Sequence, residues 1–274
     1  MKKIAVIVPM KNHSDLTMAL LDSIYSNDDY DLNYLTIYVA DTGSSDIEKR
    51  IMKQYIKNSE LDIRYIQYNY YNFAKINNDV IKHHIDKDTD LILLCNNDIQ
   101  LINNAISKLV NVYETNENVG TVGSLLLFPN YTIQHGGIIH FYDNMNIAQF
   151  SHLLLKLPYN FNLKGNYNTW GNTGAFMLIS YNDWKEIGGL NENYKDCFED
   201  VELNLQLLLK GKKNITCYDS LCFHKESSTR KQAMCAEDII RIRTFADNNE
   251  LRKISENIRI NLDKNNFKDK FINI

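Results

Sequence analysis

The first hundred residues alternate between short apolar runs and stretches with helical periodicity. The apolar, often β-branched runs that predict strands lie at residues 4–8, 35–39, 63–68 and 91–95. The stretches with an apolar face at helical spacing lie at residues 14–24, 47–56 and 75–84. Strands that alternate with helices predict a parallel, doubly wound sheet with helices on both faces.

The second half of the chain has a less regular pattern. Helices are predicted near residues 103–115 and 199–210, and strands at 121–128, 133–142, 174–180, 215–218 and 221–223. Residues 143–172 are rich in Asn and aromatic side chains and predict an irregular segment, such as a loop that orders on binding. From about residue 234 the pattern is helical and highly charged. We therefore expect a C-terminal helical extension.

Composition narrows the class of protein. The 274 residues are 44% hydrophobic and 23% charged, which is ordinary for a soluble globular chain of one large domain or a core with an appendage. The formal net charge is -4 with no basic block, so we expect no nucleic-acid partner. The five cysteines are scattered, and the N-terminus has no cleavable leader pattern. We expect a cytoplasmic protein.

Acidic and amide side chains follow two of the predicted strands. Asp41 comes directly after one strand, and Asn96-Asn97-Asp98 follows another. Ligands bind parallel sheets beyond the carboxyl ends of their strands, so these side chains should share one edge. A carboxylate suits Mg²⁺ or Mn²⁺, which take oxygen ligands, and His224 would complete such a shell. The alternatives are that Asp98 caps a helix and that His224 is a core residue.

Other polar positions also have two interpretations. Glu199 and Asp200 begin a predicted helix, where acids are favourable in any case. Neighbours on a helix do not face each other, so we assign Asp200 as a general base and Glu199 as an acceptor-binding group. Trp170, in the Gly-flanked stretch with Gly171 and Asn172, is a candidate for stacking on an acceptor sugar.

The sequence also bears on a zinc site, on two common nucleotide-binding motifs and on a possible phosphate clamp. A zinc site from Cys217, Cys222, His224 and Cys235 has the spacing of no common zinc motif. The turn after the first strand is not glycine-rich, so the dinucleotide fingerprint is absent, and no P-loop motif occurs. Lys225 and Arg230 are either surface residues or a clamp over a pyrophosphate.

Six stretches in a fixed order resemble the motifs of family 2 glycosyltransferases with the GT-A fold, especially rhamnosyltransferase-like enzymes of bacterial surface polysaccharide synthesis. They are IVPMKN at 7–12, DTGSSD at 41–46, NFAKIN at 72–77, NND at 96–98, GGLNE at 188–192 with FEDVE at 198–202, and the segment from His224 to Arg230. The match spans roughly residues 4–230. There are departures: Asn96 stands where the family has an Asp, glycines near Asn72 are missing, and Glu202 replaces an Asp.

The resemblance implies a mostly parallel central sheet flanked by helices, with a catalytic domain at 1–230 and an extension at 231–274. It implies inverting transfer of a sugar from a UDP- or dTDP-sugar to an acceptor hydroxyl in a glycan, a lipid-linked molecule or a protein. Asp200 would be the catalytic base, and Asp98 and His224 would hold Mn²⁺ or Mg²⁺. The residues implied in nucleotide-sugar binding are Pro9, Asn12, Asp41, Asn72, Lys75, Asn77, Asn96, Asn97, Asp98 and Arg230.

Two rival functions are an inactive sugar-nucleotide-binding module, which Asn96 favours, and a sugar nucleotidyltransferase, which shares the sheet and the metal. Retained Asp200 argues against the first. The second usually has a basic, glycine-rich loop where this chain has residues 9–13. The extension would pack on the catalytic domain or form a homo-oligomer, and a lipid-linked acceptor would bring the enzyme to the inner face of the membrane.

Overall fold

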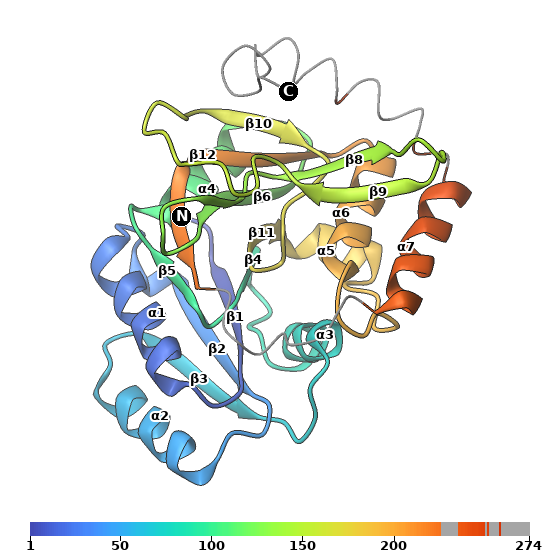
Figure 1. Cartoon of the computed structure of the whole chain (residues 1–274). Coiled ribbons are helices and arrows are strands. Elements are labelled where there is room, and N and C mark those ends of the chain that lie inside the picture. The colour runs from blue at the N-terminus through green and yellow to red at the C-terminus, as the bar shows by residue number, and fades with distance from the viewer. Residues whose placement is uncertain (226–234, 250, 252–257, 259–274) are drawn as a thin grey trace.

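A mixed β-sheet forms the centre of the protein in this computed structural model (Figure 1). The structure describes residues 1–225, 235–249, 251 and 258. Among them, ten strands form one sheet, whose main path runs β10-β12-β6-β11-β4-β1-β2-β3. The predicted GT-A architecture, with helices flanking a mostly parallel central sheet, is confirmed.

The N-terminal half of the sheet is parallel, as its alternating pattern predicts. It consists of β1 (Ile4–Met10), β2 (Leu35–Asp41), β3 (Asp62–Gln67) and β4 (Leu91–Cys95). Pro9 has no N–H to donate, and the pairing of β1 with β4 ends at Ile7, before that position. The carboxyl ends of β1, β2 and β4 therefore open at one edge, where the polar loops begin.

Alternate residues of β1 feed two apolar layers. Ile4 and Val6 pack toward α1 (Ser14–Asn27), α2 (Asp46–Asn58) and α4 (Ala105–Thr115) on one face. Ala5 and Ile7 pack toward α3 (Phe73–His83), α5 (Tyr181–Ile187) and α6 (Glu199–Leu209) on the other. The period of two along a strand explains this division, and burial on both faces explains why these strands are apolar throughout.

The C-terminal half of the sheet mixes strand directions. β11 (Phe176–Ser180) is antiparallel to both β4 and β6 (Val119–Leu127), and β12 (Lys213–His224) runs parallel to β6. The remaining sheet strands are β5 (Ile99–Leu101), β7 (Ile133–His135) and β10 (Asn166–Thr169), and a 3-10 turn, η1 (Leu32–Tyr34), precedes β2. Since β5 pairs with the end of β12, the segment after β4 lies beside His224.

The structure corrects several predicted elements. The expected strand at 133–142 is two strands, β7 and β8 (Ile138–Tyr142), because Gly137 turns the backbone with a φ of 110°. The expected loop at 143–172 contains β9 (Ala148–His152), which forms a hairpin with β8, and β10. The two short strands predicted after residue 215 are one strand with a register shift between Cys217 and Leu221. The helix α5 was not predicted.

The C-terminal helix α7 (Ala236–Asn248) packs on the catalytic fold. Its Ile242 and Ala246 are buried in an apolar cluster with Trp170 and Tyr194. The predicted domain boundary between residues 230 and 231 lies outside the described residues, and oligomerisation through this helix stays a prediction. None of the helices in the described residues is long and apolar enough to cross a membrane.

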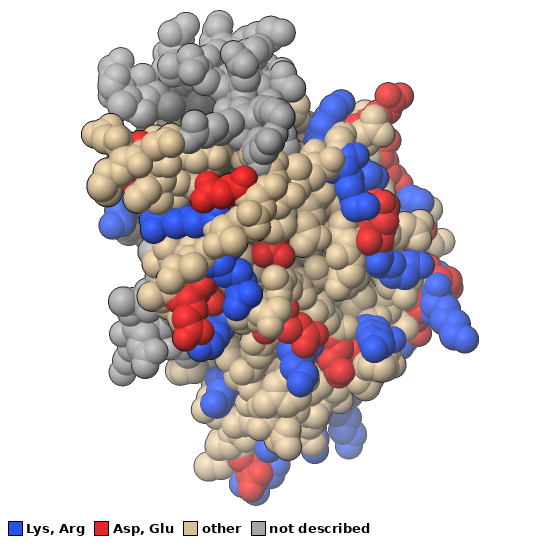
Figure 2. Space-filling view, turned by 90° about the vertical axis from the view of Figure 1, so that its right-hand side faces the viewer, with Lys and Arg blue, Asp and Glu red and all other residues tan. Residues whose placement is uncertain are grey.

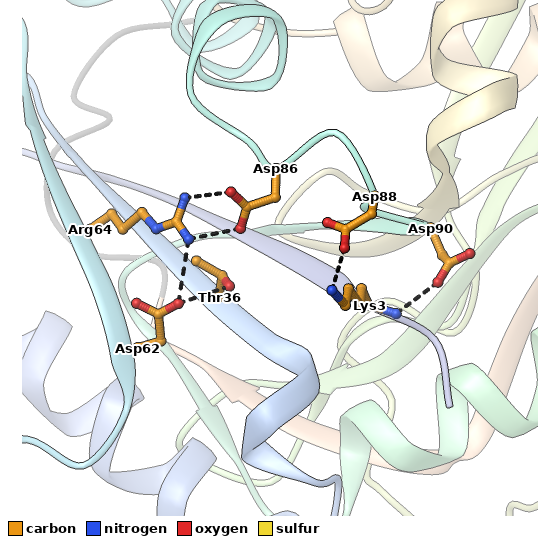
Figure 3. A network of polar contacts seen from close by, with 7 residues as sticks. All are labelled: Lys3, Thr36, Asp62, Arg64, Asp86, Asp88 and Asp90. Atoms are coloured by element: carbon orange, nitrogen blue, oxygen red, sulfur yellow. Dashed lines mark hydrogen bonds and ion pairs between the residues drawn. The ribbon is translucent and has the colours of Figure 1, made fainter.

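A polar network joins the start of β1 to the neighbouring strands (Figure 3). The Arg64 guanidinium donates to both oxygens of Asp86, at 2.9 and 2.7 Å, while Lys3 pairs with Asp88 and donates its backbone N–H to Asp90 at 2.9 Å. Lys3 lies directly before β1, Arg64 lies in β3, and the three aspartates lie in the segment before β4. The network therefore ties strand starts together, at the opposite end of the strands from the candidate site.

Candidate active site

The loops after β1 and β2 are locked to each other. The Asn12 backbone N–H donates to Ser44 Oγ at 2.7 Å, and Asn12 Oδ1 accepts from the Ser45 N–H at 2.9 Å. Asn12 has a φ of 55°, which Asn tolerates better than most residues. Its predicted contact with a nucleotide stays a prediction, but its side chain already serves the loop.

Asp41, at the end of β2, is fully buried. Its carboxylate accepts the Gly43 N–H at 3.1 Å, the Ser44 N–H at 2.8 Å and the Tyr65 hydroxyl. Burial raises the pKa of Asp41, but the hydrogen bonds from Tyr65, Ser44 and Gly43 outweigh burial and lower the pKa overall. The carboxylate is therefore ionised and shapes the turn, and its role in nucleotide-sugar binding stays a prediction.

The residues assigned around α3 lie at different depths. Asn72 caps the helix by accepting the Lys75 N–H at 2.7 Å, and its Nδ2 donates to the Tyr194 carbonyl at 3.1 Å. Lys75 is exposed and its ammonium lies 4.9 Å from the Tyr70 ring centre. Asn77 is fully buried and donates to the Phe73 carbonyl at 2.8 Å. Lys75 remains available to a phosphate, whereas Asn77 supports the helix from inside.

Asp98 and His224 meet as predicted. His224 Nε2 lies 3.2 Å from Asp98 Oδ1, and the two side chains are 12% and 6% exposed. His224 Nδ1 lies 2.6 Å from Gln134 Oε1, and Asn96 Nδ2 lies 3.3 Å from His224 Nε2. A carbonyl oxygen only accepts, so the Nδ1 of His224 carries a proton and donates to Gln134. In the neutral form of the ring with its proton on Nδ1, Nε2 presents its lone pair to the Asp98 carboxylate oxygen.

Such a pair of lone pairs fits a divalent cation. A histidine ligand typically binds metal through one ring nitrogen while a second group accepts the N–H of the other, which is the role that Gln134 plays here. The chemistry of Asp98 and His224 therefore suits Mn²⁺ or Mg²⁺. The Asn97 side chain is turned toward α1 and not toward the Asp98–His224 pair, since its Nδ2 donates to Thr17 Oγ1 at 3.1 Å.

Asp200 lies in the first turn of α6 and contacts the segment before β11. Its Oδ2 accepts the Gly174 N–H at 2.8 Å, and its Oδ1 accepts the Val201 N–H at 2.7 Å. The next residue, Ala175, accepts the Asn96 backbone N–H at 2.8 Å. Asp200 and the 96–98 turn are thus anchored to adjacent residues of one segment, although they are about a hundred positions apart in the chain.

A histidine pair supports the same segment. His135 Nε2 accepts the Thr173 N–H at 3.2 Å, so its Nδ1 carries the proton and donates to His152 Nδ1 at 2.7 Å. His135 is 1% exposed, and burial lowers its pKa well below the usual range, with His152 and His224 adding to this effect. The strand β7 therefore orients His224 through Gln134 and the segment beside Asp200 through His135. Sequence reasoning missed both residues.

The acceptor-binding assignment of Trp170, Gly171 and Asn172 does not fit the structure. Trp170 is 4% exposed and its ring packs edge-on against His140 with centres 4.8 Å apart. Asn172 is fully buried and donates to Thr121 Oγ1 at 2.9 Å and to the Ile215 carbonyl at 3.1 Å. Residues 170–172 are all buried, so their side chains cannot contact a sugar at the surface.

Glu199 is half-buried beside Asp200, so it keeps its acceptor-binding assignment as a prediction. Arg230 lies outside the described residues. The backbone N–H of Lys225 donates to the Asp98 carbonyl at 3.1 Å, so Lys225 lies beside the turn at residues 96–98. Cys217 and Cys222 are buried with free thiols on β12. The alternative zinc site is not formed, because in the described residues Cys235 groups with Asp196 and Asp238 and not with these thiols or His224.

The fold and this site define a glycosyltransferase of the GT-A type. Residues 5–188 match the family model described as glycosyl transferase family 2, and the chain belongs to that family. Among solved structures, it resembles a mannosyltransferase from Pyrobaculum calidifontis in complex with GDP-Man and Mn²⁺, with a TM-score of 0.60, 16% identity, and coverage of 83% of this chain and 58% of the other. GalNAc-T7 with UDP, GalNAc and Mn²⁺ gives a TM-score of 0.68 at 12% identity, over 89% of this chain and 48% of the other.

One curated relative is named for O-antigen biosynthesis and another as a rhamnosyltransferase. The chain is 26% identical over 240 residues to the O-antigen biosynthesis protein RfbC of Myxococcus xanthus, covering 84% of this chain but 18% of that protein. An uncharacterized protein, y4gI, of Sinorhizobium fredii is 25% identical over 89% of this chain and 27% of its own length. The rhamnosyltransferase WbbL of Escherichia coli is 24% identical over 75% of this chain and 77% of its own length. The chain thus spans less than a third of the first two relatives.

Proposed function

We propose that this chain is an inverting, metal-dependent glycosyltransferase that moves a sugar from a UDP- or dTDP-sugar to an acceptor hydroxyl in bacterial surface glycan synthesis. The observation that carries the proposal is the attachment of Asp200 and Asn96 to the neighbouring residues Gly174 and Ala175. A base and a metal-binding turn on either side of one short segment suit attack on one face of a sugar and departure of a diphosphate from the other.

Asp98 and His224 would hold Mn²⁺ or Mg²⁺. When bound, the cation would supply positive charge that stabilises the diphosphate leaving group. Gln134 keeps the proton on His224 Nδ1, so that Nε2 stays available. Lys75, exposed at the start of α3, and Arg230 are the side chains that we assign to the phosphates.

Asp200 would take the proton from the acceptor hydroxyl. Each of its oxygens accepts one backbone N–H, from Gly174 or Val201, and keeps a second lone pair for a substrate proton. The two N–H groups also fix the direction of the carboxylate, and the first turn of a helix favours negative charge. Help from a positioned base is typically worth about 10²- to 10⁴-fold in rate. Glu199 would contact the acceptor.

The donor is tested with UDP-glucose, UDP-N-acetylglucosamine, dTDP-rhamnose and GDP-mannose, each with Mn²⁺ and with a mixture of polysaccharide and lipid-linked acceptors. We expect one UDP- or dTDP-sugar to release nucleoside diphosphate, and chelation with EDTA to stop the release. Release of pyrophosphate would indicate a nucleotidyltransferase instead. Binding without any release would indicate an inactive module, and full activity in EDTA would refute the metal site.

Asp200→Asn tests the base. We expect this variant to keep the affinity of the wild type for the donor, measured by thermal shift, and to lose at least about 100-fold in turnover. Asp22→Asn, on the helix α1, is the matched control and should retain turnover. Near-normal transfer by Asp200→Asn would remove Asp200 from the role.

We also propose a cytoplasmic location, with a lipid-linked acceptor drawing the enzyme to the inner face of the membrane. Fractionation of cells that express the chain, with and without the acceptor pathway, tests this location. Figure 2 turns the side of the molecule that carries α7 toward the viewer, and Lys and Arg are interspersed with Asp and Glu there. This face therefore gives no reason to expect attraction to anionic lipids through bulk charge.

A further inference from the structure

Asp238, in the first turn of α7, is completely buried and holds a turn of another element. Its Oδ2 accepts the Asp196 N–H at 2.8 Å and the Cys197 N–H at 3.2 Å, and both of its oxygens lie 3.1 Å from the Lys195 nitrogen. A buried carboxylate is costly unless it is hydrogen-bonded, and three successive backbone N–H groups meet that need. The turn at 195–197 is therefore fixed to the C-terminal helix.

The same turn leads directly into the catalytic helix α6. Phe198, between the turn and Glu199, has a φ of 75°, which is rare for a bulky residue and persists only where neighbouring structure enforces it. Its carbonyl then accepts the Glu202 N–H at 2.9 Å and begins the helix. The direction in which α6 starts, and with it the placement of Asp200, depends on where residues 195–197 are held.

Tyr194 fixes the other end of this turn. Its carbonyl accepts from Asn72 of α3, its hydroxyl donates to Glu202 Oε2 at 2.7 Å, and the Arg241 guanidinium lies 5.7 Å from its ring centre. The turn therefore connects three helices: α3 at the proposed nucleotide side, α6 with Asp200, and α7. Of these three helices, α3 and α6 carry proposed substrate contacts and α7 carries none.

We propose that Asp238 is a positioning residue for glycosyl transfer, which acts on Asp200 through the 195–197 turn. The inference rests on the proposed role of Asp200 as the base. It makes the C-terminal helix part of the catalytic apparatus rather than an appendage. Asp196 and Cys235 also approach Asp238, within 4.8 Å, but we assign no cation there because the Asp238 oxygens already accept backbone N–H groups.

The test compares Asp238→Ala and the milder Asp238→Asn with Glu237→Gln. Glu237 is the adjacent residue and pairs with the exposed Lys195 ammonium at 2.5 Å, so its variant leaves the backbone bonds to Asp238 in place. With the fastest donor from the panel above, we expect kcat to fall roughly 10- to 100-fold in Asp238→Ala, because a small misplacement of a catalytic group has effects of that size. The donor KM should stay within about twofold. Asp238→Asn should fall between Asp238→Ala and the wild type, and Glu237→Gln should match the wild type.

A double variant separates positioning from a loss of folded protein. If Asp238 acts through Asp200, then Asp200→Asn combined with Asp238→Asn should be no slower than Asp200→Asn alone. The inference is wrong if the losses in kcat of the two single variants multiply in the double variant. It is also wrong if kcat is unchanged in folded Asp238 variants. If Asp200→Asn transfers the sugar at a normal rate, the proposed role of Asp200 fails. If Asp200→Asn is inactive but Asp238→Ala is fully active, only the inference about Asp238 fails.

Discussion

Asn204 is the central side chain of a buried polar network beneath the candidate active site, and its loss should be strongly destabilising. Its Oδ1 accepts from Thr121 Oγ1 at 2.6 Å and from the Asn172 N–H at 3.1 Å. Its Nδ2 donates to the carbonyls of Asn172 and Asp200 at 2.8 and 2.7 Å. Asn204 and Asn172 are both completely buried, so water does not replace these bonds without a rearrangement.

The magnitude follows from the groups left unpaired in Asn204→Ala. Thr121 still reaches Asn214 Oδ1 at 3.1 Å, so its hydroxyl keeps a partner. The N–H and the carbonyl of Asn172 lose theirs. Each buried unsatisfied group costs about 1–3 kcal/mol, which gives roughly 2–6 kcal/mol in the free energy of unfolding. The free energy of unfolding of a whole protein is only about 5–15 kcal/mol, so this loss is a large share of the stability.

Urea unfolding followed by tryptophan fluorescence measures this loss. With an m-value of about 2 kcal/mol per M, the midpoint should fall by about 1–3 M. Gln206→Ala on the same helix is the control; Gln206 is half-buried and donates to Glu202 at 3.2 Å, and its variant should cost no more than about 0.5 kcal/mol. A loss below about 1 kcal/mol in Asn204→Ala would refute the reasoning.

Acid should lower stability through His135, whose native pKa is depressed by burial. The unfolded chain binds a proton at His135 below about pH 6.5 and the native protein does not, so stability falls as pH decreases through and below 6.5. His135→Gln should reduce the slope of the unfolding free energy against pH below pH 6.5, by at most about 1.4 kcal/mol per pH unit, and an unchanged slope would contradict the assignment. The Arg64–Asp86 pair should contribute little to the free energy of unfolding, since its side chains are 40% and 46% exposed. Arg64→Met should cost less than about 1 kcal/mol, and the difference from the wild type should not grow in 1 M NaCl. Gly171→Ala should cost about 1–3 kcal/mol in the same urea assay, because a Cβ would lie 2.4 Å from Asn204 side-chain atoms.

The parallel half of the fold, and the sheet edge that carries the candidate site, follow from the pattern of the sequence alone. Runs such as residues 4–8 and 91–95 are apolar throughout because both faces of those strands are covered by helices. The polar residues at the ends of β2 and β4, Asp41 and Asn96 to Asp98, lie at one edge because parallel strands share the direction of their carboxyl ends. This logic uses only local periodicity and chain order.

Which polar side chains lie in the interior depends on how the elements pack in three dimensions. The sequence suggested that Trp170 and Asn172 lie at the surface and contact a sugar, yet both are buried. Trp170 lies in an apolar cluster with Ile138 and Ile242, and partners from β6, α6 and β12 satisfy Asn172. Gln134 lies 90 residues before its partner His224, and Asp238 lies about forty residues after the turn that it holds. Hydrogen bonds between such distant positions leave no periodic trace in a single sequence, since a side chain's partner is set by packing and not by spacing.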